Sequence, residues 1–225
     1  MKRRVDYHPS VLIAQSEMGG EFLFSIYDDT YPRAAYRGAA NLIGGNPTRD
    51  NSPLETLSRE IGEEFNFEEA LKVHKICTSS EEIDTLRDSL IYKVKPFADF
   101  YIRVLKEIPR ASKPYSAIYS AYNTTISQKI FEMTRQNLKQ GRKMVGEGLL
   151  GILGINDLKS GRITAHGTPF ILGAYLNLEL PHFCDMISEN IGTPREKYKD
   201  YEDDFEYGRT ATRVEEQFSS EQNNK

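Results

Sequence analysis

Cysteine is scarce in this chain of 225 residues, and so are long apolar runs. The two cysteines, Cys77 and Cys184, lie far apart and lack metal-ligand spacing, which argues against a cysteine-based metal site. Such sparse use suits a reducing compartment, and we expect both thiols to be buried. The longest apolar-leaning run, residues 148–155, is too short to span a bilayer, so we expect no membrane association.

A large surplus of either charge is also absent. The chain has 29 Lys and Arg residues against 33 Asp and Glu residues, which gives a formal net charge of −4. This balance gives no reason to expect nucleic-acid binding. The N-terminal stretch MKRRVDYHPS is basic, but no apolar stretch of signal-peptide length follows it. We therefore expect a cytoplasmic protein.

Apolar segments alternate with turn signals along the chain, whose length suits one full-sized domain. Extended segments are predicted at residues 11–16, 21–29, 34–45, 89–108 (broken near Pro96), 115–127 and 148–155, and helices at 52–67, 128–143 and 168–180, the last with Thr168 as its cap. These elements mix without regular βαβ alternation, so the sequence predicts an α+β sandwich. Residues 1–190 form the predicted domain, and residues 191–225 form a polar, charged tail that we expect to be partly disordered.

The stretch SPLETLSREIGEEFNF, residues 52–67, carries the signals of a helix start. Ser52 is a favourable N-cap, Pro53 suits the first helical position, and Glu55 completes the S-x-x-E spacing of a capping box. At about 100° per residue, one narrow arc collects the apolar side chains that we expect to be buried, Leu54, Leu57, Ile61 and Phe65.

Glu60, Glu63 and Glu64, here called the acidic edge, fall in an adjacent arc of about 100°. Their carboxylates are therefore expected at the border of the core rather than in open solvent. Arg59 precedes Glu63 by four residues and is expected to pair with it, yet one arginine cannot neutralise three glutamates. A hard divalent cation, Mg²⁺ or Mn²⁺, would balance the remaining charge. The alternative is an ordinary solvated acidic face.

The spacing of these residues resembles the Nudix box, whose pattern is G-x5-E-x7-R-E-U-x-E-E-x-G-U, with U a bulky aliphatic residue. The match begins at Gly45 and continues with Arg59, Glu60, Ile61, Glu63, Glu64 and Phe67. Two positions depart, since Asn51 replaces the glutamate that precedes the helix and Asn66 replaces the second glycine. We expect Asn66 to adopt the left-handed conformation of that glycine. Asn51 removes a carboxylate, for which the neighbouring Asp50 is a candidate substitute.

The resemblance implies a Nudix-like α/β/α sandwich with a mixed sheet. It also implies a metal-dependent hydrolase that cleaves the diphosphate linkage of a nucleoside diphosphate joined to another group. The metal ligands that it implies, for Mg²⁺ with Mn²⁺ as the alternative, are Glu60, Glu63 and Glu64. The catalytic residues that it implies are Glu63, Glu64, Glu147 and Arg59. The substrate-binding residues that it implies are Gly44, Gly45 and Arg59. For Glu147 an exposed loop glutamate is the alternative interpretation.

The resemblance implies a small nucleotide as the ligand, and homodimers are frequent in the family. Two other hypotheses stay open. The first is a catalytically impaired Nudix-fold module that binds a nucleotide or has a regulatory role, and Asn51 favours it. The second is an RNA-processing or regulatory protein that uses the tail to bind partners, and the acidic net charge disfavours it.

Core packing is the alternative to base stacking for four aromatic residues, Tyr92, Phe97, Phe100 and Tyr101. His166 is a candidate for substrate contact or for a structural role.

Overall fold

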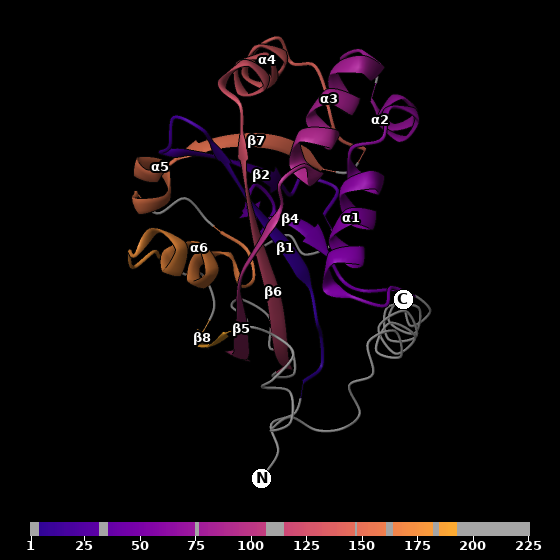
Figure 1. Cartoon of the computed structure of the whole chain (residues 1–225). Helices are drawn as coiled ribbons and strands as arrows, with labels where there is room; N and C mark the ends of the chain where they lie inside the picture. Colours follow the sequence, from indigo (N-terminus) through magenta and orange to yellow (C-terminus); the bar gives the residue numbers. More distant parts are fainter. Residues whose placement is uncertain are drawn as a thin grey trace.

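Among the residues that the structure describes, eight strands form one mixed sheet that separates two groups of helices (Figure 1). The structure, a computed structural model, describes residues 5–31, 36–74, 77–106, 115–146, 148–160, 164–181 and 185–192. The strands are β1 (Ser10–Ser16), β2 (Glu21–Ile26), β3 (Ala40–Asn41), β4 (Ile43–Gly45), β5 (Lys95–Lys106), β6 (Tyr115–Ile126), β7 (Leu149–Gly154) and β8 (Asp185–Gly192). Their order is β3-β2-β1-β6-β5-β8, with β4 paired to β1 and β7 paired to β2. Of these pairs, β1–β6 is parallel and the others are antiparallel.

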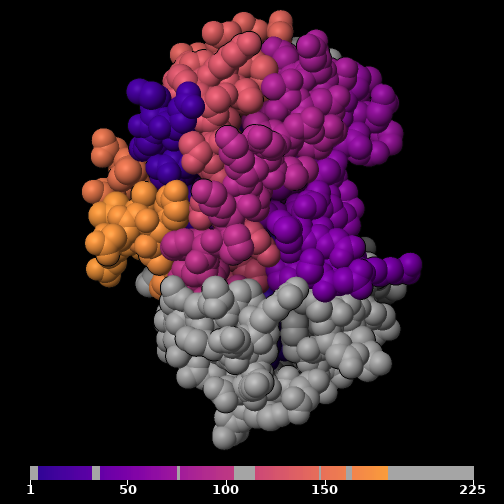
Figure 2. All heavy atoms as spheres, viewed as in Figure 1, coloured from indigo at the N-terminus to yellow at the C-terminus, as the bar shows by residue number. Residues whose placement is uncertain are grey.

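Two apolar clusters fill the space between the sheet and the helices. Successive side chains of a strand point to opposite faces, so Leu12 and Ala14 of β1 join one cluster while Val11 and Ile13 join the other. The first cluster is covered by α1 (Pro53–Glu64), α2 (Phe67–Val73), α3 (Ser80–Ile91) and α4 (Gln128–Lys139), and the second by α5 (Ile155–Lys159) and α6 (Thr168–Leu176). The space-filling view shows α1 to α3 (purple to magenta) and α6 (orange) on opposite flanks (Figure 2). The predicted α/β/α sandwich with a mixed sheet is therefore confirmed.

Most predicted elements are confirmed with shorter bounds. The strands at 11–16, 21–29 and 115–127 correspond to β1, β2 and β6, and the helices at 52–67 and 128–143 correspond to α1 and α4. The extended segment predicted at 34–45 shortens to β3 and β4, because the chain turns at residues 36–38. The strand at 148–155 corresponds to β7, and α5 follows it directly.

The strand predicted at 89–108 is wrong in its first part, because α3 extends into it and β5 starts only at Lys95. The start of this helix is fixed by Ser79, whose hydroxyl accepts a hydrogen bond from the backbone N–H of Glu82 at 3.3 Å. The predicted break near Pro96 is a register shift within β5, directly after the proline. Proline there leaves one ladder hydrogen bond unmade without ending the strand.

The cap predicted for the helix at 168–180 is displaced by one residue, since Gly167 rather than Thr168 is the N-cap of α6. The hydroxyl of Thr168 donates to Oδ1 of Asn41 at 2.9 Å and accepts from the backbone N–H of Leu42 at 3.2 Å. Because both bonds reach across to the β3 region, Thr168 anchors α6 on the sheet instead of capping it.

A buried polar chain crosses three neighbouring segments of the sheet. The carboxylate of Asp99 on β5 is hydrogen-bonded to the Ser120 side chain on β6, and Ser120 Oγ lies 3.0 Å from Nε2 of His8, just before β1. Asp99, Ser120 and His8 are each 1% exposed. The second carboxylate oxygen of Asp99 finds no hydrogen-bond partner in the described part of the chain. The three groups therefore share one desolvated environment.

Other predictions meet the structure only in part. Cys77 is partly exposed, so its predicted burial is wrong, and Cys184 lies outside the described residues. The strand β8, which pairs with β5, was not predicted and crosses the expected domain boundary at residue 190. The tail beyond Gly192 lies outside the described residues. In the ranges described above, no helix has the length and apolar character needed to cross a membrane.

Candidate functional site

The start of α1 has the predicted cap. The hydroxyl of Ser52 accepts a hydrogen bond from the backbone N–H of Glu55 at 3.2 Å, and Pro53 begins the helix. The carboxylate of Glu55 turns back to Asn51, where it accepts from the backbone N–H at 2.8 Å and from the side-chain amide at 3.2 Å. Asn51 is therefore engaged with the helix start.

The apolar stripe of α1 is buried from its second turn onward. Leu57, Ile61 and Phe65 are at most 1% exposed, as predicted, and they pack against the sheet through the first cluster. Leu54 is 48% exposed, so its predicted burial is wrong. The first buried residue of the helix is Thr56, so the first turn does not pack against the core.

The three glutamates of the acidic edge differ in how far their side chains are exposed. The side chain of Glu60 is 19% exposed and that of Glu63 is 63% exposed, while Glu64 is intermediate. The expected position at the border of the core is confirmed for Glu60 and wrong for Glu63, which reaches into solvent. Glu60 is therefore more desolvated than Glu63. Burial raises the pKa of the Glu60 carboxyl above its ordinary value, although the nearby Arg59 guanidinium opposes this shift.

Arg59 lies at the centre of the charged groups around α1. Its guanidinium is 2.8 Å from Glu63, as predicted, and also 2.8 Å from Glu60. On its other side it is 3.0 Å from Asp50, and it donates to the backbone carbonyl of Asn46 at 2.8 Å. One guanidinium thus contacts three carboxylates, so the cluster keeps an excess of negative charge that a further cation would offset.

Asp50 is the most deeply buried of these carboxylates, at 5% exposure. Nε and Nη2 of Arg59 donate to its two oxygens at 3.0 to 3.2 Å. It also accepts from the backbone N–H of Thr48 at 3.1 Å and from the hydroxyl of Thr56 at 3.0 Å. Burial alone would raise the pKa of Asp50, but the hydrogen bonds from Arg59, Thr48 and Thr56 outweigh it and lower that pKa.

The predicted glycine pair lies against the site in a way that larger residues would prevent. A Cβ added to Gly45 would lie 2.5 to 2.7 Å from the Glu60 carboxylate. Gly44 has φ +127°, and a Cβ there would lie 2.2 Å from the carbonyl oxygen of Ser10. The structure therefore explains both glycines by close approach, with Gly45 forming the floor beneath Glu60.

Glu147 lies outside the described residues, but the chain just before it is attached to α1. The backbone N–H of Gly146 donates to the carbonyl oxygen of Glu64 at 2.8 Å. This bond places Gly146 at the C-terminal end of the acidic edge. Burial is the main cause that raises the pKa of Tyr27 well above its ordinary value; the neighbouring Tyr31 adds to this shift, and the charge of Glu64 contributes less.

The donor set fits a hard metal ion in chemical kind, because every candidate donor is a carboxylate oxygen. In the part of the chain that the structure describes, no three His, Cys, Asp or Glu side chains are grouped so as to hold a metal ion. Arg59 contacts one oxygen each of Glu60 and Glu63. A metal ion bound at this edge would compete with Arg59 for these oxygens.

Asn66 does not adopt the predicted left-handed conformation. Its φ and ψ are −116° and 120°, and its side-chain oxygen accepts from the backbone N–H of Glu69 at 3.2 Å. Asn66 is the N-cap of α2. This role needs an extended backbone and a short polar side chain, which is why asparagine suits the position.

The aromatic candidates divide between core and surface. Phe100 is 2% exposed and packs with Phe97 in the second cluster, which confirms core packing for Phe100. The Tyr101 hydroxyl donates to Ser116 Oγ at 3.1 Å. Tyr92 is 68% exposed at the end of α3, so core packing is wrong for this residue. Neither of these two contacts involves the acidic edge.

His166 occupies a structural position beside the second cluster. Its backbone has φ +50°, and its ring stacks on Tyr36 with ring centres 5.0 Å apart. It also meets Tyr27 edge-on at 5.9 Å. These contacts support the structural interpretation of His166.

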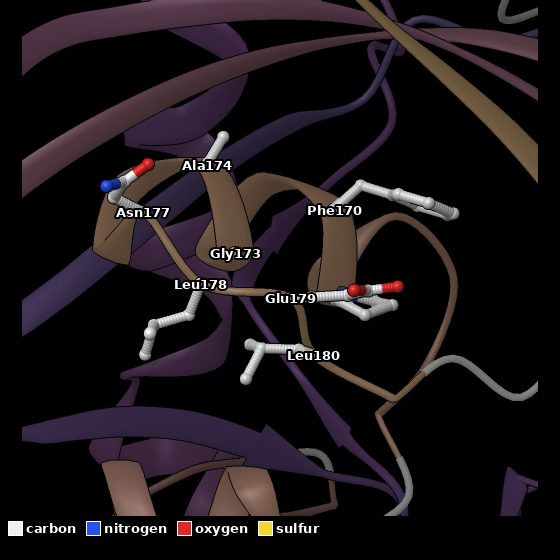
Figure 3. A pocket seen from close by; sticks show the side chains of 8 residues that line it. Phe170, Gly173, Ala174, Asn177, Leu178, Glu179 and Leu180 are labelled. Atoms are coloured by element: carbon white, nitrogen blue, oxygen red, sulfur yellow. The ribbon is translucent and has the colours of Figure 1, made fainter.

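A pocket of about 440 Å³ lies beside α6, on the face of the sheet opposite α1 (Figure 3). It is lined by Pro169, Phe170, Gly173, Ala174, Asn177, Leu178, Glu179 and Leu180. Its lining contains one ionisable side chain, Glu179, and none of the residues around Arg59. The pocket is therefore separate from the charged cluster.

No protein-family model matches the chain, and no curated protein matches it. Among solved structures, it is similar to a mutT/nudix family protein from Listeria innocua, with 13% identity, a TM-score of 0.45, and coverage of 78% of this chain and 95% of that chain. A MutT protein from Methanosarcina mazei Go1 has 12% identity and a TM-score of 0.39, with coverage of 71% of this chain and 84% of that chain. A Mutator MutT protein from Bacillus halodurans has 13% identity and a TM-score of 0.42, with coverage of 84% of this chain and 99% of that chain. At these TM-scores and identities, the similarities assign neither a family nor an activity to this chain.

Proposed function

We propose that the chain is a metal-dependent hydrolase that cleaves the diphosphate linkage of a nucleoside diphosphate joined to another group. The observation that carries this proposal is the cluster around Arg59, where one guanidinium contacts three carboxylates at the edge of a helix. Stability alone does not require this excess of negative charge, and like charges at this spacing are destabilising. The residues also keep the R-E-x-x-E-E spacing that resembles the Nudix box.

In this proposal Glu60, Glu63 and Glu64 bind Mg²⁺ or Mn²⁺. When bound, the metal would neutralise the diphosphate oxygens, polarise phosphorus and lower the pKa of a coordinated water. Glu60 is held in place by Arg59 and the close backbone of Gly45. A carboxylate oxygen of Glu63 or Glu147 accepts the proton of the attacking water.

The second candidate is a module that binds a nucleotide without hydrolysing it. The pairing of Glu63 with Arg59 favours this candidate, because the guanidinium competes with a metal ion for a carboxylate oxygen of Glu63. The two candidates differ in product formation. The binding module retains the nucleotide unchanged, whereas the hydrolase releases phosphate-containing products in a metal-dependent reaction.

The test measures products from nucleotide sugars, ADP-ribose, dinucleoside polyphosphates, NADH and nucleoside triphosphates, with and without Mg²⁺ or Mn²⁺. The variant Glu63→Gln/Glu64→Gln is expected to lose at least about 100-fold in rate. Glu68→Gln, an exposed position on the neighbouring α2, is the control and is expected to retain the wild-type rate. Tight nucleotide binding without any product would replace the hydrolase with the binding module.

A further inference from the structure

We propose that Asp50 is the positioning residue of the acidic edge: it holds Arg59, and through Arg59 it fixes Glu60, in place of the glutamate that the pattern has at position 51. This inference rests on the proposed function, because it concerns the same carboxylates. It assigns no direct contact between Asp50 and the substrate. Its consequence is that Asn51 leaves no gap in the charged cluster.

The geometry of the Arg59 side chain supports this role. Asp50 binds the guanidinium edge formed by Nε and Nη2, with distances of 3.0 to 3.2 Å. On the side of the acidic edge, Nη1 lies 2.8 Å from Glu63, and Nη2, which also binds Asp50, lies 2.8 Å from Glu60. A bidentate pair fixes the plane of a guanidinium. Asp50 therefore determines where the donors for Glu60 and Glu63 lie.

Asp50 is itself fixed from two sides. The backbone N–H of Thr48 binds it from the preceding loop, and the buried hydroxyl of Thr56 binds it from α1. A carboxylate that accepts several hydrogen bonds stays ionised, which agrees with the lowered pKa of Asp50. The loop, the helix and the guanidinium are thus joined at one side chain.

Asn51 is directed elsewhere. Its side chain is exposed, and its amide donates to Glu55 at the helix start. An amide carries no charge to pair with a guanidinium. The carboxylate that the pattern places at position 51 is therefore supplied by the preceding residue of this chain.

The experiment moves the carboxylate by one residue. Asp50→Asn, the double variant Asp50→Asn/Asn51→Glu, and Asn51→Ala are compared with wild type in kcat and KM on the substrate found by the product screen. Asp50→Asn is expected to lower kcat about 10- to 100-fold with little change in KM, as for residues that orient metal ligands. The double variant is expected to recover most of that loss, and Asn51→Ala to keep the wild-type kcat.

Circular dichroism and thermal unfolding accompany each variant, with Asp88→Asn as the control because that side chain is 71% exposed. An active Asp50→Asn would overturn the inference while leaving the proposed hydrolase intact. A folded double variant without recovery would overturn it as well, and so would failure of both Asp50 variants to fold, since Asp50 would then act in stability alone. An inactive wild-type protein across the whole screen would instead remove the proposed function, and this inference with it.

Discussion

The buried chain of Asp99, Ser120 and His8 makes stability depend on pH in two opposite ways. Burial raises the pKa of Asp99 from 3.8 to about 7 and lowers the pKa of His8 from 6.5 to about 3. Each unit of difference from the unfolded chain corresponds to about 1.4 kcal/mol. Ionised Asp99 therefore costs the folded state about 4 kcal/mol, and protonated His8 about 5 kcal/mol.

The two contributions have opposite signs. Between pH 3.8 and 7, folded Asp99 keeps a proton that the unfolded chain releases, so stability falls as pH rises. Between pH 3 and 6.5, unfolded His8 binds a proton that the folded protein does not, so stability falls as pH drops. Over the shared range these two effects nearly cancel in the wild-type protein.

Asp99→Asn removes one side of this balance. We compare the free energy of unfolding of the variant with that of wild type at each pH. Between about pH 4.5 and about pH 7.5, we expect the variant to gain about 3 kcal/mol of stability relative to wild type. His8→Gln is expected to change in the opposite direction. Urea unfolding of both variants at these pH values gives the differences directly, with exposed Asp88→Asn as the control. A difference for Asp99→Asn that stays constant across the range would refute the reasoning.

Two further predictions concern α1. Gly45→Ala is expected to lower activity at least about 10-fold, because the new Cβ would displace the carboxylate of Glu60; Gly62→Ala, where a Cβ meets nothing within 4 Å, should instead stabilise the helix by about 0.5–1 kcal/mol. Equal rates for the two variants would contradict this. Leu57→Ala is expected to cost about 2–5 kcal/mol in urea unfolding, whereas the exposed Leu54→Ala should cost less than about 1 kcal/mol. Similar costs would mean that the first turn is packed after all.

Local patterns predicted the centre of α1 well. The cap at Ser52, the buried stripe at Leu57 and Ile61, and the pair between Arg59 and Glu63 all depend on contacts within a few residues. Such contacts follow from helical geometry alone. The same kind of signal was available for α3, where Ser79 and Glu82 have the spacing of a helix start, but the aromatic and β-branched residues that follow favoured a strand.

Contacts between distant segments were not predictable in this way. His8 and Ser120 meet across 112 positions, and no local pattern links them. The role of Asp50 lies closer in sequence, yet it depends on which way a loop side chain turns. Asn66 shows the same limit, because its conformation was set by a second helix that begins directly after it.

The parallel pairing of β1 with β6 affects the order in which the site can form. The stretch from Gly45 to Glu64 is made early during synthesis, but its floor, β4, is attached to β1. β1 completes its own pairing only when Ser10 meets Ser120, so the sheet under the acidic edge closes over a separation of 110 residues. Closing so long a loop costs entropy before its contacts are gained. A nascent chain that ends before β6 therefore carries every described residue of the charged cluster on an unfinished support. This part of the site is completed late although its residues, from Gly45 to Glu64, are made early.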